Sequence, residues 1–168
     1  MFLLNPHLMR IKSKGTIRLN TTNPMDQPII DPKYLSVPED MADMIESIKF
    51  VFYMIEATSL RKYVDIYPVP IPGCSYCPNI PVYKCDSYIR CLLKQYGGSA
   101  SHPSGSCRMS SPDRSDSVVD PNLRVNGIHN LRVNDASIMP LIPNANTNAA
   151  CIMIGEKGAD LIKQTWPN

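Results

Sequence analysis

HPSGSCRM at residues 102–109 and NANTNAACIMIGEKGADLI at residues 144–162 set the second half of this chain apart. The first stretch places His102 among small residues, with Pro103 fixing the backbone after it. The second is an Asn-rich turn that runs into an apolar helical pattern, so it presents backbone N–H groups at a helix N-terminus. Such a terminus favours developing negative charge. Because imidazoles titrate near neutrality, His102 beside that terminus suits proton removal from a hydroxyl.

Length and composition are those of a chain with one ordinary hydrophobic core. The 168 residues are 43% hydrophobic and 19% charged, and the net charge of +2 comes from mixed signs along the chain. A nucleic-acid partner is not expected, because no basic face is clustered. No apolar run approaches the roughly 20 residues that cross a bilayer. MFLLNPHLMRIKSKG at residues 1–15 also lacks a small-residue cleavage site, so no signal peptide is expected.

Local patterns predict two short strands and then a long helix. Residues 16–19 alternate polar and apolar side chains, and Ile29-Ile30 is a short apolar strand within a turn-rich segment. Ser36 and Glu39 have capping-box spacing, which predicts a helix with Ser36 as N-cap that runs to about Ala57. Its expected buried stripe consists of apolar residues at helical spacing: Met41, Met44, Ile45, Ile48, Phe52 and Ile55.

After Ala57 no new helix is indicated until residues 86–95. That second helix is expected to bury an apolar face formed by Ile89, Leu92 and Leu93 and to end at Gly97-Gly98. Between the two predicted helices, residues 66–81 are rich in proline, which favours an extended, turn-rich loop.

The last third predicts a hairpin and a final helix. Asn126-Gly127 separates two Leu-Arg-Val segments, residues 123–125 and 131–133, and an Asn-Gly turn is a strong hairpin signal. The final helix is expected over about residues 147–164. Gly155 and Gly158 weaken that helix and are expected to allow close packing against it.

Six cysteines leave two interpretations open. Cys74 and Cys77 have the CxxC spacing that begins many zinc sites, but the next two cysteines, Cys85 and Cys91, are separated by five residues and supply no matching pair. A disulfide within residues 74–91 is favoured in an oxidising compartment. We therefore assign no metal site, and we interpret Cys107 and Cys151 as buried thiols.

The motifs of the last 70 residues resemble, in order, the C-terminal signature of the glucose-methanol-choline (GMC) oxidoreductases. That signature reads His-Pro-x-Gly-Thr-Cys-x-Met-Gly, then Leu-Arg-Val-x-Gly, Asp-Ala-Ser-x-Met-Pro, and Asn-Thr-Asn-Ala before a final helix. Here the matching stretches are HPSGSCRM, then VVDPNLRVNGIHNLRVNDASIMP at residues 118–140, then NANTNAACIMIGEKGADLI. SKGTIRLNTTNPMDQPIIDPKYLSVPEDM at residues 13–41 is similar to the family's substrate domain. The insect glucose dehydrogenase-like branch is the most similar.

The resemblance implies an α+β fold shared between two interleaved domains. Residues 1–98 would supply a portion of the substrate-binding domain, with its sheet and helices. Residues 99–168 would form the C-terminal segment that returns to complete the FAD-binding domain.

The resemblance also implies FAD-dependent oxidation of the CH–OH group of an alcohol or sugar, with hydride transfer to flavin N5. His102 falls on the family's catalytic base, and Asn146 on its second active-site position, where an amide can hold the substrate oxygen. The cofactor-binding positions are Asp135, Ala136, Asn146 and Thr147, the last through its backbone N–H at the helix start. Oxygen or a quinone would reoxidise the flavin.

Two features separate this sequence from the family pattern. The first is a set of substitutions at motif positions, of which Ala145 in place of glycine would strain the backbone if φ is positive there; the others are Ser106, Ser110 and Ala150. The second is that no three of the eight glycines fit GxGxxG. The family's FAD fingerprint belongs to an N-terminal half that we expect to be missing, so the chain is expected to be a fragment.

A non-catalytic protein is the competing interpretation. It would be a decayed paralogue, or a binding module that keeps the substrate-domain fold. For the full-length protein, the family's frequent secretion and the cysteine-rich loop favour an extracellular location.

Overall fold

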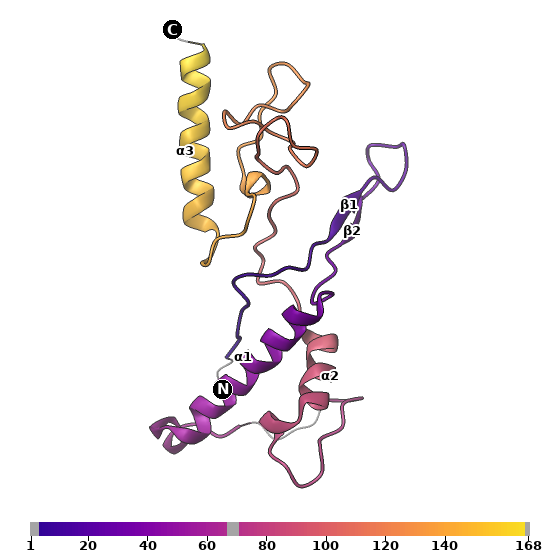
Figure 1. Cartoon of the computed structure of the whole chain (residues 1–168), viewed down its shortest axis with the longest axis vertical. Helices are drawn as coiled ribbons and strands as arrows, with labels where there is room; N and C mark the ends of the chain where they lie inside the picture. The colour runs from indigo at the N-terminus through magenta and orange to yellow at the C-terminus, as the bar shows by residue number, and fades with distance from the viewer. Residues whose placement is uncertain (1–3, 67–70, 167–168) are drawn as a thin grey trace. The chain divides into compact units, whose positions relative to one another are not determined.

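The computed structural model describes residues 4–66 and 71–166 and divides into two compact units. The first comprises residues up to Gly15 together with Ile30–Ala100, and the second comprises Thr16–Ile29 together with the chain from Ser101 onward. Figure 1 shows the course of the chain and labels its elements. The assignment of residues 1–98 to a substrate domain and of residues 99–168 to an FAD domain stays a prediction.

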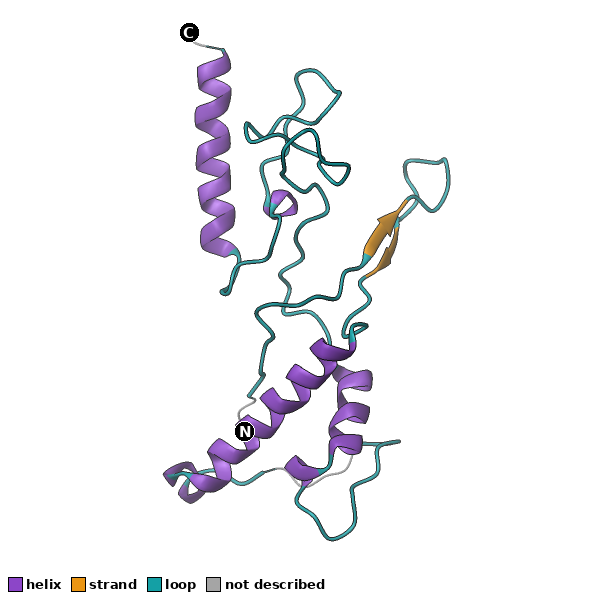
Figure 2. Ribbon diagram, in the orientation of Figure 1, coloured by secondary structure: helices purple, strands orange, loops and turns teal. Residues whose placement is uncertain are grey.

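The two expected strands are present and pair with each other. β1 (Thr16–Arg18) and β2 (Ile29–Asp31) form a two-stranded sheet, drawn in orange in Figure 2. Their connecting loop is held by its own polar side chains, because Asn23 Nδ2 donates to Asp26 Oδ1 at 3.0 Å. Together with the helices, this sheet confirms the predicted α+β class.

The first helix, α1 (Pro38–Ala57), ends where the sequence predicts but does not begin with a capping box. Its N-cap is Val37, which has no side-chain oxygen, and Pro38 occupies the first helical position, where a missing N–H costs nothing. Prediction of Ser36 as N-cap is therefore wrong by one residue. The hydroxyl oxygen of Ser13, from a distant part of the chain, accepts the Val37 N–H at 3.0 Å instead.

The start of α1 is tied further by a buried carboxylate. Asp40 is 2% exposed, and its side-chain oxygens accept the backbone N–H groups of Lys12 and Ser13 at 3.0 and 2.6 Å and also the Ser13 hydroxyl. Burial raises the pKa of Asp40, but these hydrogen bonds outweigh it and hold the pKa below its usual value. The carboxylate thus holds residues 12–13 against the first turn of α1.

The predicted stripe of α1 packs against the second helix, α2 (Asp86–Tyr96). Ile89 is fully buried in this core. The other buried members are Met41, Ile45, Ile48 and Leu93, with Met44, Phe52 and Leu92 partly buried against them. The predicted faces of both helices are confirmed, and α2 ends at Gly97, whose N–H bonds the carbonyl of Leu93 at 2.8 Å.

Two disulfides close the cysteine-rich loop that precedes and includes α2. Cys74 pairs with Cys91, and Cys77 pairs with Cys85 inside the same loop. This confirms the disulfide interpretation. The zinc interpretation is wrong, because the sulfurs of Cys74 and Cys77 are each bonded to another cysteine. Among the described residues there is also no cluster of three metal-binding side chains.

Short 3₁₀ turns flank this region. η1 (Ser59–Lys62) follows α1 directly, where no helix was predicted, and the hydroxyl oxygen of Thr58 accepts the Leu60 N–H as its cap. η2 (Val82–Lys84) leads into α2. Part of the proline-rich stretch, residues 67–70, lies outside the described residues, and residues 71–81 form turns and loop.

In the second unit, irregular chain is organised around Val119, which is fully buried. The predicted hairpin is only partly formed: Gly127 has a positive φ of 78°, but pairing is limited to an isolated antiparallel bridge between Arg124 and Arg132. Val125 instead forms an isolated antiparallel bridge with Val119, and its side chain is partly buried in the core around Val119. The core contains Val119, Leu123, Ile138, Met139 and Ile154.

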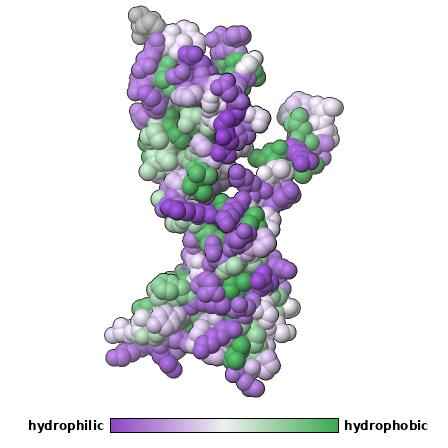
Figure 3. Space-filling model, viewed as in Figure 1, coloured by the Kyte–Doolittle hydropathy of each residue, from purple (hydrophilic) through white to green (hydrophobic). Residues whose placement is uncertain are grey.

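The last helix, α3 (Asn148–Thr165), has the predicted extent. Its two glycines differ in role. Gly158 is buried against the Asn134 side chain, as predicted, but Gly155 has no described atom within contact distance of its open side. Apolar side chains remain exposed on both units (Figure 3), among them Phe50 on α1 and Ile152 and Met153 on α3. No helix in residues 4–66 or 71–166 is long and apolar enough to span a bilayer.

Candidate active site

A tight turn positions His102. Ser101, just before it, has a positive φ of 64°, a conformation that costs a residue with a side chain and is often found at functional sites. Gly105, just after it, has φ 83°, and a Cβ there would lie 3.2 Å from the carbonyl oxygen of Met139. Glycine suits both restrictions because it has no Cβ, and it fixes the backbone three residues after the histidine.

Backbone hydrogen bonds then hold this turn beside the Asp-Ala-Ser segment. The N–H groups of Gly105, Cys107 and Met109 donate to three successive carbonyls at 3.2, 2.9 and 2.8 Å. Those carbonyls belong to Ala136, Ser137 and Ile138, which form the 3₁₀ turn η3. Two motifs about 30 residues apart in the sequence therefore act as one structural element.

Asp135 begins that turn. Its carboxylate accepts the Ser137 N–H at 2.8 Å, as a cap does. Hydrogen bonds from the side chain and backbone of Ser137 lower the pKa of Asp135, and they outweigh the opposing effect of desolvation. The carboxylate stays ionised at neutral pH and fixes the local backbone.

The ring of His102 lies between two residues at the start of α3. Its Nε2 is 3.1 Å from Asn146 Oδ1, and its Nδ1 is 2.9 Å from Thr147 Oγ1. His102 is half-buried, Asn146 is exposed and Thr147 is 7% exposed. One edge of the imidazole therefore faces the interior of the unit and the other faces an accessible amide.

Thr147 occupies the N-cap position of α3 without capping it. Its φ and ψ are −76° and −8°, which are helical, and its side chain makes no bond to the first turn. A capping residue normally has an extended backbone. Because the first N–H groups of a helix have no partners within it, the first turn of α3 presents backbone donors that the side chain of Thr147 does not cap.

The structure brings together three of the residues predicted for the site: His102, Asn146 and Thr147. The carbonyl of Ala136 accepts the N–H of Gly105 in the segment that carries His102, and Asp135 caps the 3₁₀ turn that contains Ala136. The strain considered for Ala145 is absent, because its φ is not positive. The sequence did not indicate that the hydroxyl of Thr147 reaches His102, since the two residues are 45 positions apart.

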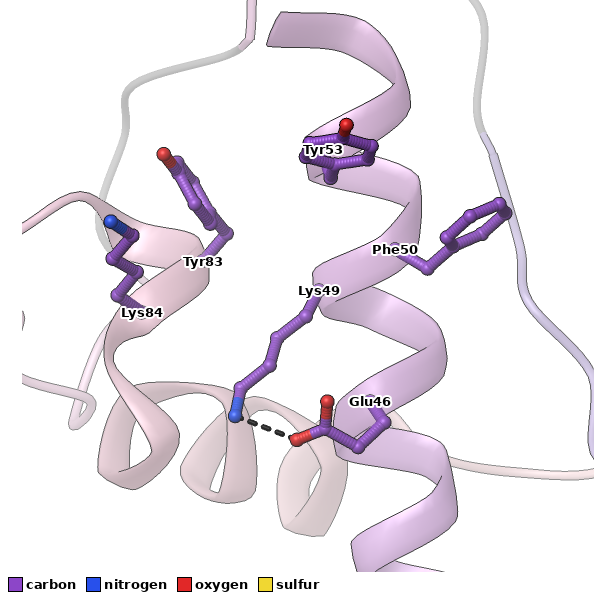
Figure 4. A pocket seen from close by; sticks show the side chains of 6 residues that line it. All are labelled: Glu46, Lys49, Phe50, Tyr53, Tyr83 and Lys84. Carbon is purple, nitrogen blue, oxygen red and sulfur yellow. Dashed lines mark hydrogen bonds and ion pairs between the residues drawn. The ribbon is translucent and has the colours of Figure 1, made fainter. Parts of the chain in front are cut away.

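A separate hollow of about 420 Å³ lies between α1 and η2 in the other unit (Figure 4). Lys49 and Glu46 form an ion pair at 2.7 Å in its lining, and Tyr83 and Lys84 line it from η2 with their side chains directed away from that pair. Lys49 also pairs with Asp86 at 2.7 Å, so its charge is already compensated. None of the predicted site residues lines this hollow.

Comparison with known proteins explains the three motifs and their order. Residues 12–155 match the family model described as GMC oxidoreductase, in its C-terminal part. The chain belongs to the GMC oxidoreductase family. This confirms the resemblance and places the α+β units described above in the C-terminal fold of that family.

GMC relatives match almost the whole chain. It is 36% identical over 162 residues to a glucose dehydrogenase (FAD, quinone) of Drosophila melanogaster, covering 96% of this chain and 25% of the relative. It is 42% identical over 151 residues to an alcohol dehydrogenase (acceptor) of Pseudomonas putida, covering 90% and 25%. The structure of formate oxidase from Aspergillus oryzae is similar with a TM-score of 0.78 and 30% identity, covering 93% of this chain and 26% of that one.

This chain spans about a quarter of the length of those GMC relatives. The activity of a whole GMC protein therefore involves residues beyond the 168 described by this sequence.

Proposed function

We propose that this chain is the C-terminal part of an FAD-dependent oxidoreductase that oxidises the CH–OH group of an alcohol or sugar. In this proposal His102 is the catalytic base, and Asn146 holds the substrate oxygen. The observation that carries the proposal is the 3.1 Å contact between His102 Nε2 and Asn146 Oδ1, at an accessible edge of the unit and across 44 residues of sequence. Membership of the GMC oxidoreductase family supports it.

The donor groups at the start of α3 fit a flavin. The first turn of α3, which the side chain of Thr147 does not cap, carries partial positive charge that would stabilise negative charge on a nearby ring. Asp135, Ala136, Asn146 and Thr147 are the residues that would adjoin the cofactor. When bound, FAD supplies the hydride acceptor, while the protein supplies position and electrostatics.

The chain's own residues would handle the proton. The substrate hydroxyl would replace the direct contact between the amide of Asn146 and the Nε2 of His102 and come within hydrogen-bond reach of both. Nε2 would take the hydroxyl proton, and the half-buried ring would hold it as an imidazolium. Asn146 cannot take the proton, because an amide is not a base near neutral pH; its role is to hold the oxygen in line.

The decisive experiment is the rate of flavin reduction by an alcohol panel in the flavin-loaded protein that contains this chain. His102→Gln is expected to slow reduction by roughly 10²- to 10⁴-fold, the usual contribution of a positioned base. His129→Gln is the matched control, because His129 is exposed in the same unit. A reduction rate close to wild type in His102→Gln would refute the proposed role and favour a non-catalytic protein.

The compartment belongs to the same proposal. Two disulfides within residues 74–91 support an oxidising environment, and hence an extracellular location for the whole protein. Oxygen or a quinone would serve as the final electron acceptor. Recovery of the secreted protein with both disulfides intact would support this location, and its retention in the cytosol would contradict it.

A further inference from the structure

The hydroxyl of Thr147 contacts His102 and does not cap its own helix. It lies 2.9 Å from Nδ1, and the residue is 7% exposed. Threonine at an N-cap ordinarily stabilises its helix by accepting a first-turn N–H. Thr147 makes no such bond. The hydroxyl of Thr147 instead contacts the imidazole of His102.

The two ring nitrogens of His102 differ in access. Nδ1 faces the buried Thr147, whereas Nε2 faces the exposed Asn146. A neutral imidazole carries one N–H, and the bond made by one nitrogen determines which of them is protonated. Nε2 is on the exposed side of the ring, so the ring can act as a base on that side only when its resting proton is on Nδ1.

We propose that Thr147 is a positioning residue that accepts a hydrogen bond from Nδ1–H of His102 and so keeps Nε2 free to take a proton. This inference rests on the proposed function, because it assumes that His102 acts as the base. It assigns the side chain of Thr147 a role that is separate from the backbone N–H of the same residue.

The observed contacts satisfy the protonated ring directly, and they satisfy the neutral ring once the amide of Asn146 rotates. In the neutral state Nδ1–H donates to Thr147 Oγ1, and the Nε2 lone pair faces the substrate hydroxyl or the amide N–H of Asn146 after rotation of that amide. Proton transfer breaks the substrate O–H bond and forms Nε2–H. The imidazolium then donates to Thr147 Oγ1 from Nδ1 and to Asn146 Oδ1 from Nε2, at the 2.9 and 3.1 Å separations observed.

The opposite tautomer, with the ring proton on Nε2, could not act as a base from the exposed side of the ring. If the Thr147 hydroxyl donated to Nδ1, the ring proton would be on Nε2 and would point to Asn146 Oδ1. The lone pair would then face the buried hydroxyl of Thr147 and not the exposed side of the ring. Removal of the hydroxyl is therefore expected to change the tautomer and not only the packing.

Long-range ¹H–¹⁵N spectra of the ¹⁵N-labelled 168-residue chain test the proposal directly. The three histidines are His7, His102 and His129, and single substitutions assign their signals. At alkaline pH, where imidazoles are neutral, His102 is expected to be mainly Nδ1–H. Thr147→Val, which keeps the shape, is expected to lose this preference, and Thr147→Ser is expected to restore it.

A wild-type His102 that is mainly Nε2–H would overturn the proposal, whatever the variants do. An unchanged tautomer ratio in Thr147→Val would overturn it too. Both readouts are independent of the cofactor. Backbone amide signals of α3 report whether Thr147→Val is folded, and the wild-type spectrum alone decides the matter if it is not.

Flavin reduction in the loaded protein separates this proposal from the proposed function. Thr147→Val is expected to slow reduction by roughly ten- to a hundred-fold, as when an outer partner of a functional histidine is removed, and Thr147→Ser is expected to retain most of the rate. If His102→Gln abolishes flavin reduction but neutral His102 in the wild type is mainly Nε2–H, the proposed function is supported and the proposed role of Thr147 is refuted. If the Nδ1–H tautomer is found but His102→Gln reduces normally, the function falls instead.

Discussion

Gly158 of α3 lies directly against the side chain of Asn134, so that a Cβ at Gly158 would meet Asn134 Cγ at 2.6 Å. Gly155, one helical turn earlier, faces open space among the described residues. The pair allows the packing role of a glycine to be separated from its weak helix propensity.

We expect Gly158→Ala to destabilise the chain and Gly155→Ala to stabilise it. Alanine gains about 1 kcal/mol of helix propensity at either position, but at Gly158 an overpacking cost of about 1–3 kcal/mol opposes this gain. Urea unfolding followed by circular dichroism measures both. Equal effects of the two substitutions would mean that the contact with Asn134 has no energetic consequence.

Asp40 should make the first unit sensitive to acid. Its pKa is below the usual value in the folded chain because Ser13 and Lys12 donate hydrogen bonds to the carboxylate. A carboxyl whose pKa is lowered by folding stabilises above its unfolded pKa, which is about 4, and loses that contribution as the pH falls through the folded value.

Asp40→Asn is therefore expected to lower the free energy of unfolding by roughly 2–3 kcal/mol at pH 7, the scale of hydrogen bonds to a buried charge. The difference from wild type should shrink below about pH 4. Asp43→Asn, at an exposed position of the same helix, is the control. A deficit that is constant with pH would show that packing, and not ionisation, sets the effect.

The two disulfides should stabilise the first unit to slightly different extents. In the chain-entropy model, losing the Cys74–Cys91 link, of sequence separation 17, costs about 3 kcal/mol. Losing Cys77–Cys85, of separation 8, costs about half a kcal/mol less. Paired Cys→Ser variants and urea unfolding measure these costs. Non-reducing peptide maps check the pairing, and a Cys74–Cys77 peptide would contradict it.

The isolated chain is expected to purify without flavin. The sequence contains no GxGxxG fingerprint, so the strand-to-helix turn that cradles the pyrophosphate is not among these 168 residues. We expect no flavin absorbance in the visible spectrum after purification and no retention of added FAD on gel filtration. A yellow protein with one equivalent of FAD would show that the C-terminal part alone suffices for binding.

Much of the fold could be predicted from local pattern. The stripe from Met41 to Ile55 and the face around Ile89 follow from helical spacing alone, because one side of each helix must leave water. The start of α1 could not be predicted in the same way. Ser36 is a plausible N-cap from local sequence, but the hydroxyl oxygen of Ser13, 24 residues away, accepts the N–H of Val37. Local signals cannot reveal a partner that tertiary structure brings in.

The same division applies to the site. The motifs around His102 and Asn146 identified the family and the candidate residues, since residue types and their order are written in the sequence itself. Only the tertiary structure decided which atoms meet: Nε2 with Asn146 and Nδ1 with Thr147, across 44 and 45 residues. The physical reason is that side-chain distances depend on how η3, the HPSG turn and the start of α3 pack together. The sequence thus determined what chemistry is available, and packing determined which nitrogen of His102 can perform it.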